Sequence, residues 1–179
     1  MQLDHYVHTL GKYLKTRFGE RVHKLPLHAG FTCPNRDGTI GRGGCSFCSV
    51  DSFSEERSDS VDGQLAHGRQ AIEWVRRYLA YFQAYTNTYA EIEHLRALYD
   101  AALASRDVVG LCVGTRPDCV PDAVLDLLAA YQAGGSEIWL ELGLQSAFDK
   151  TLERVHRGHD FGAYAETVAR AQARSIPVC

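Results

Sequence analysis

A glycine-rich stretch with three cysteines constrains this chain more than any other feature. Residues 33–48 contain Cys33, Cys45 and Cys48, half of the six cysteines, together with four glycines. Glycine allows positive φ angles and lets the backbone approach a bulky group closely. Few side chains in such a loop can pack into a core, so its chemistry resides in the sulfur atoms. We therefore expect the rest of the chain to form a frame that presents three thiolates.

Length and charge limit the classes of function that fit. With 179 residues the chain has the size of one domain that can bury a core. Its net charge of −3 gives no overall electrostatic reason to bind nucleic acid or an acidic membrane. A local basic run over residues 12–24 is explained best as a solvated helix face, and an RNA contact is the weaker interpretation. Without an apolar leader or a long apolar span, the sequence predicts a cytoplasmic protein with no membrane association.

The cysteines are more consistent with a metal site than with disulfides. In a reducing compartment, clustered cysteines bind metal or carry out redox chemistry more often than they form a disulfide framework. Three of them could hold three irons of a [4Fe–4S] cluster and leave the fourth iron open. A structural zinc site would need a fourth protein ligand, which His28, Cys112 or Cys119 could supply. Unliganded structural cysteines are the least favoured interpretation, because a glycine-rich loop does not bury small apolar side chains.

Apolar periodicity predicts strands that alternate with helices. Helices are expected over residues 1–19, 61–77, 92–102, 123–131, 148–155 and 161–174. Strands are expected over residues 21–28, 78–84, 108–114 and 138–144, with a fifth beginning at 176–179. Pro26 indicates that the first strand lies at a sheet edge or ends there. The alternation predicts an α/β fold with right-handed βαβ units and a parallel sheet.

Polar clusters follow the predicted strands. The cysteine loop, Thr86 with Asn87, Thr115 with Arg116, and Gln145 with Ser146 each come directly after a strand. In α/β barrels and open parallel sheets, functional groups gather at the carboxyl ends of the strands. These four clusters are therefore expected to meet at one rim of the sheet.

Four segments in a fixed order resemble a known family. They are residues 23–48, 80–88, 110–118 and 141–160. With them the chain resembles the radical S-adenosylmethionine (SAM) enzymes, and more narrowly the YhcC-type proteins, which are related to the Elongator catalytic subunit and to oxygen-independent coproporphyrinogen oxidase. The cysteines are separated by eleven residues and then two, whereas the commonest radical SAM spacing has three and then two. This departure fits the YhcC-type group.

The resemblance implies a fold and a reaction. The fold is a partial TIM-like (βα) barrel with about the first four to five strands present; residues 1–179 form the radical SAM core and 1–20 a helical extension. Because related barrels have about six βα units, we expect a chain truncated at its C-terminus. Reductive cleavage of SAM would give a 5′-deoxyadenosyl radical that modifies an unknown substrate. A one-electron reductant such as a flavodoxin or ferredoxin is the implied partner, and kinship with the Elongator subunit points weakly to tRNA.

The resemblance also implies the site residues. Cys33, Cys45 and Cys48 would hold a [4Fe–4S] cluster, and the open iron would bind the amine and carboxylate of SAM. Six residues are assigned as SAM contacts: Gln83, Thr86, Arg116, Glu141, Gln145 and Arg157.

Two features depart from the relatives. Gln83 and Thr86 fall where those proteins carry a glycine-rich motif, and Gly114 falls where some of them carry a glutamate. Glu141 is the candidate substitute, because it shares a predicted strand face with Gly143 and Gln145. The alternative for Glu141 is a structural charge, paired with Arg116.

Two other interpretations stay open from the sequence. One is a non-enzymatic zinc- or RNA-binding module that uses the same cysteines with His28, and whose basic N-terminal helix contacts phosphate. The other is a catalytically silent relative. For Arg157, the alternative to a SAM contact is a surface arginine at a helix end.

Overall fold

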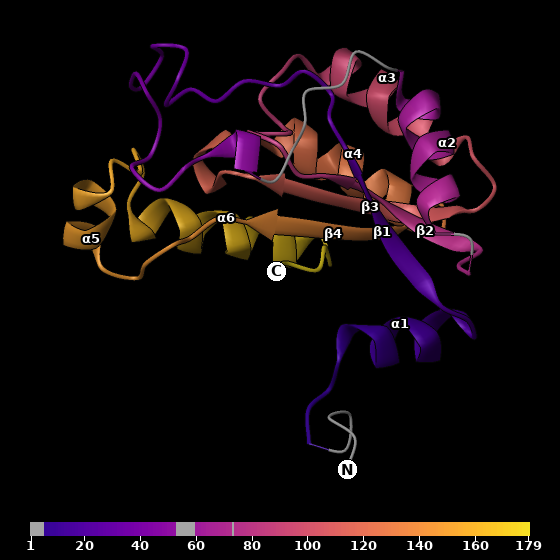
Figure 1. Cartoon of the computed structure of the whole chain (residues 1–179). Helices are drawn as coiled ribbons and strands as arrows, with labels where there is room; N and C mark the ends of the chain where they lie inside the picture. The colour runs from indigo at the N-terminus through magenta and orange to yellow at the C-terminus, as the bar shows by residue number, and fades with distance from the viewer. Residues whose placement is uncertain (1–5, 53–59, 73) are drawn as a thin grey trace.

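The structure is a computed structural model that describes residues 6–52, 60–72 and 74–179 (Figure 1). Its helices are α1 Leu10–Phe18, α2 Val61–Ala71, α3 Ile92–Leu103, α4 Asp122–Ala133, α5 Asp149–Arg154 and α6 Phe161–Ala173. Its strands are β1 Val22–Leu27, β2 Arg77–Phe82, β3 Val108–Thr115 and β4 Glu137–Leu142. Two short 3₁₀ turns, η2 Val50–Ser52 and η3 Pro117–Cys119, complete the elements.

The four strands form one parallel sheet in the order β1-β2-β3-β4. This order confirms the predicted α/β fold, and it places Pro26 on an edge strand, where a residue without an N–H costs no ladder bond. Residues 177–179 lie beside the other edge: Val178 bridges to Leu140, and the Leu142 N–H donates to the Cys179 carbonyl oxygen at 2.9 Å. A fifth strand therefore begins there, as the sequence predicts.

Two predicted helices differ from the observed ones. The helix predicted over 61–77 ends at Ala71, because Arg77 already opens β2 and pairs with Val22 of β1. The first helix begins at Leu10 after Thr9, whose side chain accepts the Lys12 N–H; residues 1–5 of that prediction lie outside the described residues. The polar sequence of residues 51–60 is typical of a loop, and its residues 53–59 also lie outside the described residues.

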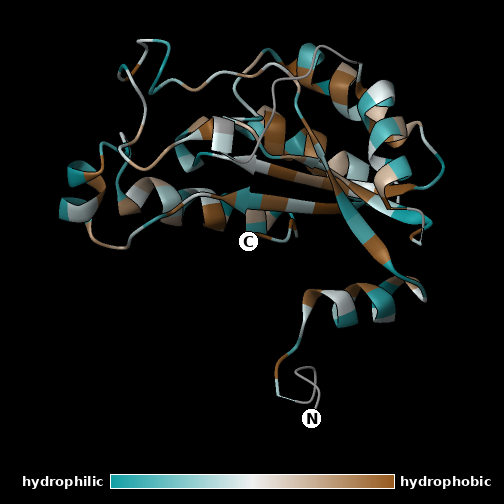
Figure 2. Cartoon of the chain, viewed as in Figure 1, coloured by the Kyte–Doolittle hydropathy of each residue, from teal (hydrophilic) through white to brown (hydrophobic). Residues whose placement is uncertain are grey.

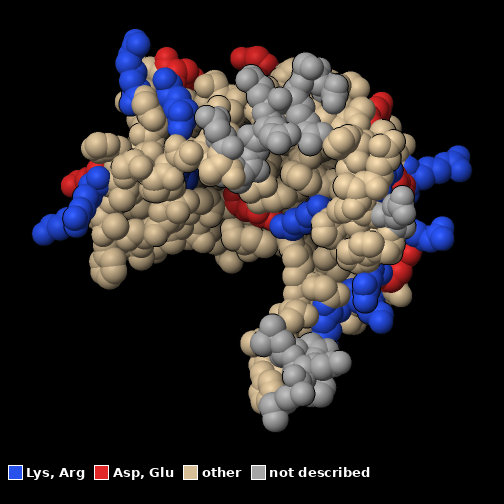
Figure 3. All heavy atoms as spheres, in the orientation of Figure 1, with Lys and Arg blue, Asp and Glu red and all other residues tan. Residues whose placement is uncertain are grey.

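Helices cover the two faces of the sheet unequally (Figures 1 and 2). Residues such as Leu111 and Val113 of β3 pack into the large core with Leu95 of α3 and Leu125 of α4. The residues between them point to the other face, where Cys112 packs in a small cluster with Leu14 of α1. We call this second face the inner face. Because α1 covers only part of it, the inner face is hollowed (Figure 3).

Strand β3 keeps the inner face open. Beyond a register shift near the start of the strand, its residues on that face are Gly110, Cys112 and Gly114, which alternate with large side chains of the outer core. Val109, at the shift, also packs against the small cluster of the inner face. A Cβ on Gly110 would lie 1.8 Å from the carbonyl oxygen of Glu137, so this position accepts no side chain. Side chains from neighbouring strands can therefore extend over β3.

None of the helices in the described ranges has the length and apolar character needed to span a bilayer.

Candidate metal and cofactor site

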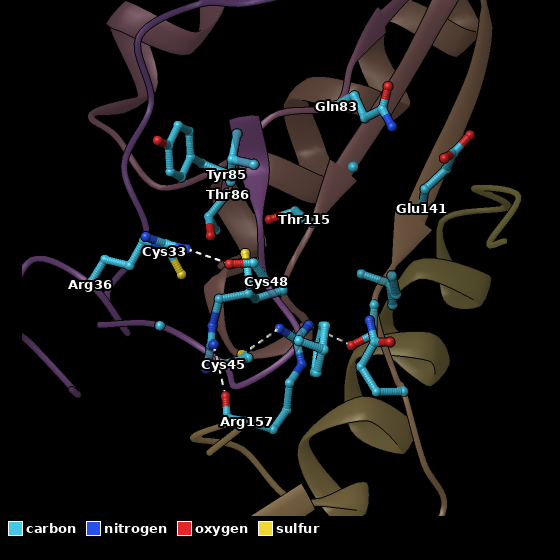
Figure 4. Close-up of a pocket in the computed structure, with 18 of the residues that line it drawn as sticks. Cys33, Arg36, Cys45, Cys48, Gln83, Tyr85, Thr86, Thr115, Glu141 and Arg157 are labelled. Carbon is cyan, nitrogen blue, oxygen red and sulfur yellow. Dashed lines mark hydrogen bonds between the residues drawn. The ribbon is translucent and has the colours of Figure 1, made fainter. Parts of the chain in front are cut away.

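One cavity of about 420 Å³ lies at the carboxyl ends of the strands (Figure 4). The three clustered cysteines and all six residues assigned as SAM contacts line it: Cys33, Cys45, Cys48, Gln83, Thr86, Arg116, Glu141, Gln145 and Arg157. They come from the cysteine loop, from the segments that end or follow β2, β3 and β4, and, for Arg157, from the turn after α5. A parallel sheet brings these segments together because all its strands end at the same edge. The structure thus gathers the nine residues, which are up to 124 positions apart, around one space.

The cysteine loop is held by its own backbone. The Arg36 N–H donates to the Cys33 carbonyl oxygen at 2.7 Å, and the Cys48 N–H donates to the Cys45 carbonyl oxygen at 2.9 Å. Gly44 has φ +83, and a Cβ there would lie 2.8 Å from Nε of Arg36. Glycine at this position is therefore required both by the turn and by the arginine that lies against it.

Two buried donors point at the sulfur of Cys45. Asn35 donates from Nδ2 to Cys45 Sγ at 3.4 Å, and Arg157 donates from Nη1 to the same atom at 3.6 Å. Asn35 and Arg157 are only 5% and 7% exposed. Hydrogen-bond donors and a positive charge can stabilise a sulfur that carries negative charge, as a metal-bound sulfur does. The surroundings of Cys45 therefore suit a metal-bound sulfur.

Arg157 is buried in the wall of the cavity and is no surface residue. Its Nη2 donates to the Gly143 carbonyl oxygen at 2.6 Å, and a Cβ on Gly143 would lie 2.7 Å from that nitrogen. Its own carbonyl oxygen accepts from Nη1 of Arg116 at 2.8 Å. Nε of Arg157 has no hydrogen-bond partner among the described residues. A buried donor without a partner, on the wall of a cavity, is available to a ligand.

Arg116, the partner named in the alternative interpretation of Glu141, does not pair with it in the structure. Arg116 turns toward Asp118, two residues on, and donates to its two carboxylate oxygens at 2.9 and 2.7 Å. Glu141 instead forms an ion pair with Lys24 of β1, which crosses the inner face to reach it. The sequence could not show this pair, because 117 positions separate the two residues.

Strained backbone marks the rim of the cavity. Tyr85 and Gln145 have φ values of 65° and 72°, in the left-handed region that residues with a side chain rarely adopt. Each such residue costs about 1–3 kcal/mol, and these conformations cluster at functional sites. β4 ends at Leu142, so Gly143 and Gln145 lie beyond the strand and not on its face as predicted, yet both line the cavity.

Thr86 contributes a second unpartnered group. Its side-chain oxygen is buried and has no hydrogen-bond partner among the described residues, although the residue is only 1% exposed. Its backbone N–H is satisfied by the Thr32 carbonyl oxygen at 3.2 Å. The hydroxyl of Thr86 and Nε of Arg157 thus leave two polar atoms for a ligand in the same cavity.

A four-ligand zinc site finds no support in the geometry. His28, Cys112 and Cys119 do not line the cavity of the three cysteines. In the part of the chain that the structure describes, no three His, Cys, Asp or Glu side chains are grouped closely enough to hold one metal ion. Burial raises the pKa of Cys112 and of Cys119 to about 12, so both are neutral thiols. A cubane cluster does not demand the same closeness, because each of its cysteines binds a different iron.

Three residues near the cavity were not identified from the sequence. Asn35 and Arg36 lie inside the cysteine loop, where Arg36 donates to the Cys48 carbonyl oxygen at 2.8 Å. Their position between two cysteines is a signal that could have singled them out. In the sequence, Lys24 is one residue of a basic run. Its partner, Glu141, lies on a distant strand and could be identified only from the fold.

Comparisons with known proteins show the family of this chain. The sequence profile of the Radical SAM superfamily matches residues 33–179, from the first cysteine of the loop to the last residue. The chain belongs to the radical SAM superfamily. Within it the chain is similar to YhcC of Escherichia coli K12, with 58% identity over 100% of this chain and 59% of that protein. It is also similar to YtqA of Bacillus subtilis, with 43% identity over 96% of this chain and 55% of that protein. The chain therefore spans under two thirds of the length of these relatives.

Solved structures support the fold. OxsB, a cobalamin-dependent S-adenosylmethionine radical enzyme solved with aqua-cobalamin and SAM bound, superposes with a TM-score of 0.56 at 15% identity. The match covers 94% of this chain and 24% of OxsB. At this identity the likeness concerns the fold, and it identifies the four-stranded sheet as part of a radical SAM barrel.

Proposed function

We propose that this chain binds a [4Fe–4S] cluster through Cys33, Cys45 and Cys48 and cleaves SAM reductively to modify a substrate. The observation that carries the proposal is the cavity itself, which combines three cysteines with unpartnered polar groups. A cluster with three protein ligands supplies an open iron that binds the amine and carboxylate of SAM and an electron that cleaves its sulfonium, giving methionine and a 5′-deoxyadenosyl radical. A one-electron reductant such as a flavodoxin or ferredoxin is the partner that this chemistry requires.

The residues of the chain bind and orient in this proposal. Arg157 places a positive charge beside Cys45, and its free Nε suits the carboxylate of SAM. The hydroxyl of Thr86 and the side-chain amides of Gln83 and Gln145 offer donors and acceptors along the cavity. The carboxylate of Glu141 accepts hydrogen bonds from hydroxyl or amine groups.

Arg116 acts through Arg157 and not by contact with SAM. Its guanidinium is 2% exposed and is already engaged by Asp118 and by the Arg157 carbonyl oxygen. Arg116 therefore fixes the backbone of Arg157 and adds positive charge to the wall. Apolar lining residues, among them Val50 and Leu142, reduce the access of water.

Anaerobic reconstitution with iron and sulfide tests the proposal. The chain is expected to turn brown, to bind about four irons and to release 5′-deoxyadenosine when SAM and dithionite are added. A colourless protein that retains one tightly bound zinc ion would overturn the cluster. A brown protein that forms no 5′-deoxyadenosine would identify a catalytically silent chain.

A groove beside α1, at the amino end of β1 and away from the cysteine cavity, has the composition of a surface that contacts RNA. Its described lining contains four basic side chains and no acidic one: Lys12, Lys15, Arg21 and His23. Trp74, which is 64% exposed, lies in the same groove, with the Arg21 guanidinium 5.3 Å from the centre of its ring. Lys and Arg side chains gather along this part of the surface (Figure 3). Positive charge beside an exposed aromatic ring suits the phosphates and bases of single-stranded RNA.

Replacing Trp74 by alanine should weaken RNA binding about 5- to 150-fold, because stacking of one base contributes about 1–3 kcal/mol. Fluorescence anisotropy with a labelled single-stranded 20-nucleotide RNA measures the affinity, and binding should also weaken as salt rises. Lys150→Ala, which removes an exposed lysine on α5, is the matched control. Equal affinity of the wild type and Trp74→Ala would exclude this groove as an RNA site.

A further inference from the structure

Lys24 makes an unusual crossing of the inner face. It belongs to the edge strand β1, whereas its partner Glu141 belongs to β4 at the opposite edge, and β2 and β3 lie between them. The lysine side chain can pass because, beyond the register shift near its start, β3 presents the small residues Gly110, Cys112 and Gly114 on this face. Figure 3 shows acidic and basic atoms side by side in the hollow between the body and α1.

Aromatic rings enclose the ammonium group of Lys24. Its Nζ lies 4.6 Å from the centre of the Tyr81 ring and 5.2 Å from that of Trp139. Cation–π contacts of this kind favour the charged form and fix its position. The side chains of Lys24 and Glu141 are only 22% and 21% exposed, so the ion pair is screened less by water than a surface pair.

The other carboxylate of the inner face is already engaged. Glu137 accepts from the Tyr13 hydroxyl at 3.3 Å, from Nε of Arg17 at 3.2 Å and from Nε1 of Trp139 at 2.8 Å. These bonds attach α1 to the far end of β4. Lys24 is therefore directed to Glu141, which is the carboxylate at the cavity end of the same strand.

Glu141 lies at the side of the cavity away from the cysteine loop. Figure 4 shows Glu141 and Gln83 on one side, across from Cys33 and Arg36. A SAM molecule whose amine and carboxylate are held near the cysteines would extend its nucleoside toward Glu141. A carboxylate half-buried among Tyr81 and Leu142 needs a permanent counter-charge to stay in place and ionised.

We infer that Lys24 is a positioning residue for SAM: it holds the Glu141 carboxylate where that group accepts a hydrogen bond from the nucleoside of SAM. The inference rests on the proposed function, since it requires SAM in the cavity. Lys24 is not among the residues that line the cavity, whereas Glu141 is. Its effect on SAM should therefore pass entirely through Glu141.

A double-mutant cycle on the reconstituted chain tests this dependence. Equilibrium dialysis with labelled SAM measures the dissociation constant for the wild type, Lys24→Met, Glu141→Gln and the double variant. Lys24→Met and Glu141→Gln should each weaken SAM binding about 10-fold, the loss expected for one hydrogen bond to a charged group. In the Glu141→Gln background, Lys24→Met should change the affinity less than about 2-fold. Lys24→Arg should restore most of the affinity.

Iron content and melting temperature separate positioning from folding. Lys150→Met is the control for loss of a lysine, and it should match the wild type in all measurements. If Lys24→Met binds iron poorly, Lys24→Gln replaces it in the cycle. A loss of affinity from Lys24→Met that is equally large in both backgrounds would overturn the inference, as would normal affinity in Glu141→Gln. A wild type that loads iron but binds no SAM would instead refute the proposed function.

Discussion

Replacing Cys45 by alanine is expected to abolish cluster binding. Cys45 is the most buried of the three clustered cysteines, and its sulfur accepts hydrogen bonds from both Asn35 and Arg157. The variant removes one of three iron ligands and leaves Nη1 of Arg157 without its sulfur partner. After anaerobic reconstitution, iron should fall from about four atoms per chain to under one, and the broad visible absorbance should disappear.

Cys119→Ala is the matched control for this loss. Cys119 is also buried, at 8% exposure, but it lies on η3 outside the cavity of the three cysteines. The control variant should retain iron and colour. Because Cys119 was one candidate for a fourth zinc ligand, loss of metal in Cys119→Ala would revive the zinc interpretation. A brown Cys45→Ala protein would contradict the assignment of Cys45.

Replacing Arg157 by methionine is expected to weaken SAM binding about 10- to 150-fold while iron is retained. Methionine replaces the aliphatic part of the arginine side chain. The variant loses the charge beside Cys45 and the unpartnered Nε donor. A hydrogen bond to a charged group contributes about 1.5–3 kcal/mol, which corresponds to this range. Equilibrium dialysis with labelled SAM gives the affinity, and iron analysis shows whether the cluster is loaded.

Arg154→Met separates this effect from a general loss of positive charge. Arg154 is three residues away on α5, and it is exposed. Its replacement should leave the SAM affinity within about 2-fold of the wild type. Unchanged affinity in Arg157→Met would show that the arginine only fastens the Gly143 carbonyl oxygen, in which case the melting temperature should fall instead.

Local signals in the sequence predicted most of the fold. Gly19, which ends α1 with φ 75, and Pro26 on the edge strand β1 act through their own backbone, so their effects are visible in one segment. The helix predicted over residues 61–77 is too long because of a contact between distant residues, not because of a local signal. In the β1–β2 ladder, Arg77 lies beside Val22, which is far away in the chain. This strand pairing overrides the helical pattern of apolar residues that the sequence shows up to residue 77.

The sequence by itself determined that three cysteines stand in a glycine-rich loop, that strands alternate with helices, and that polar residues follow the strands. These features depend on residues that are close together in the chain, so the spacing of those residues in the sequence is enough to predict them. Only the tertiary structure decided which charges meet. Arg116 pairs with Asp118, two residues on, whereas Glu141 pairs with Lys24 from the far side of the sheet. Lys24 reaches Glu141 because three small residues of β3 leave space above the sheet, and that space exists only once the strands are paired.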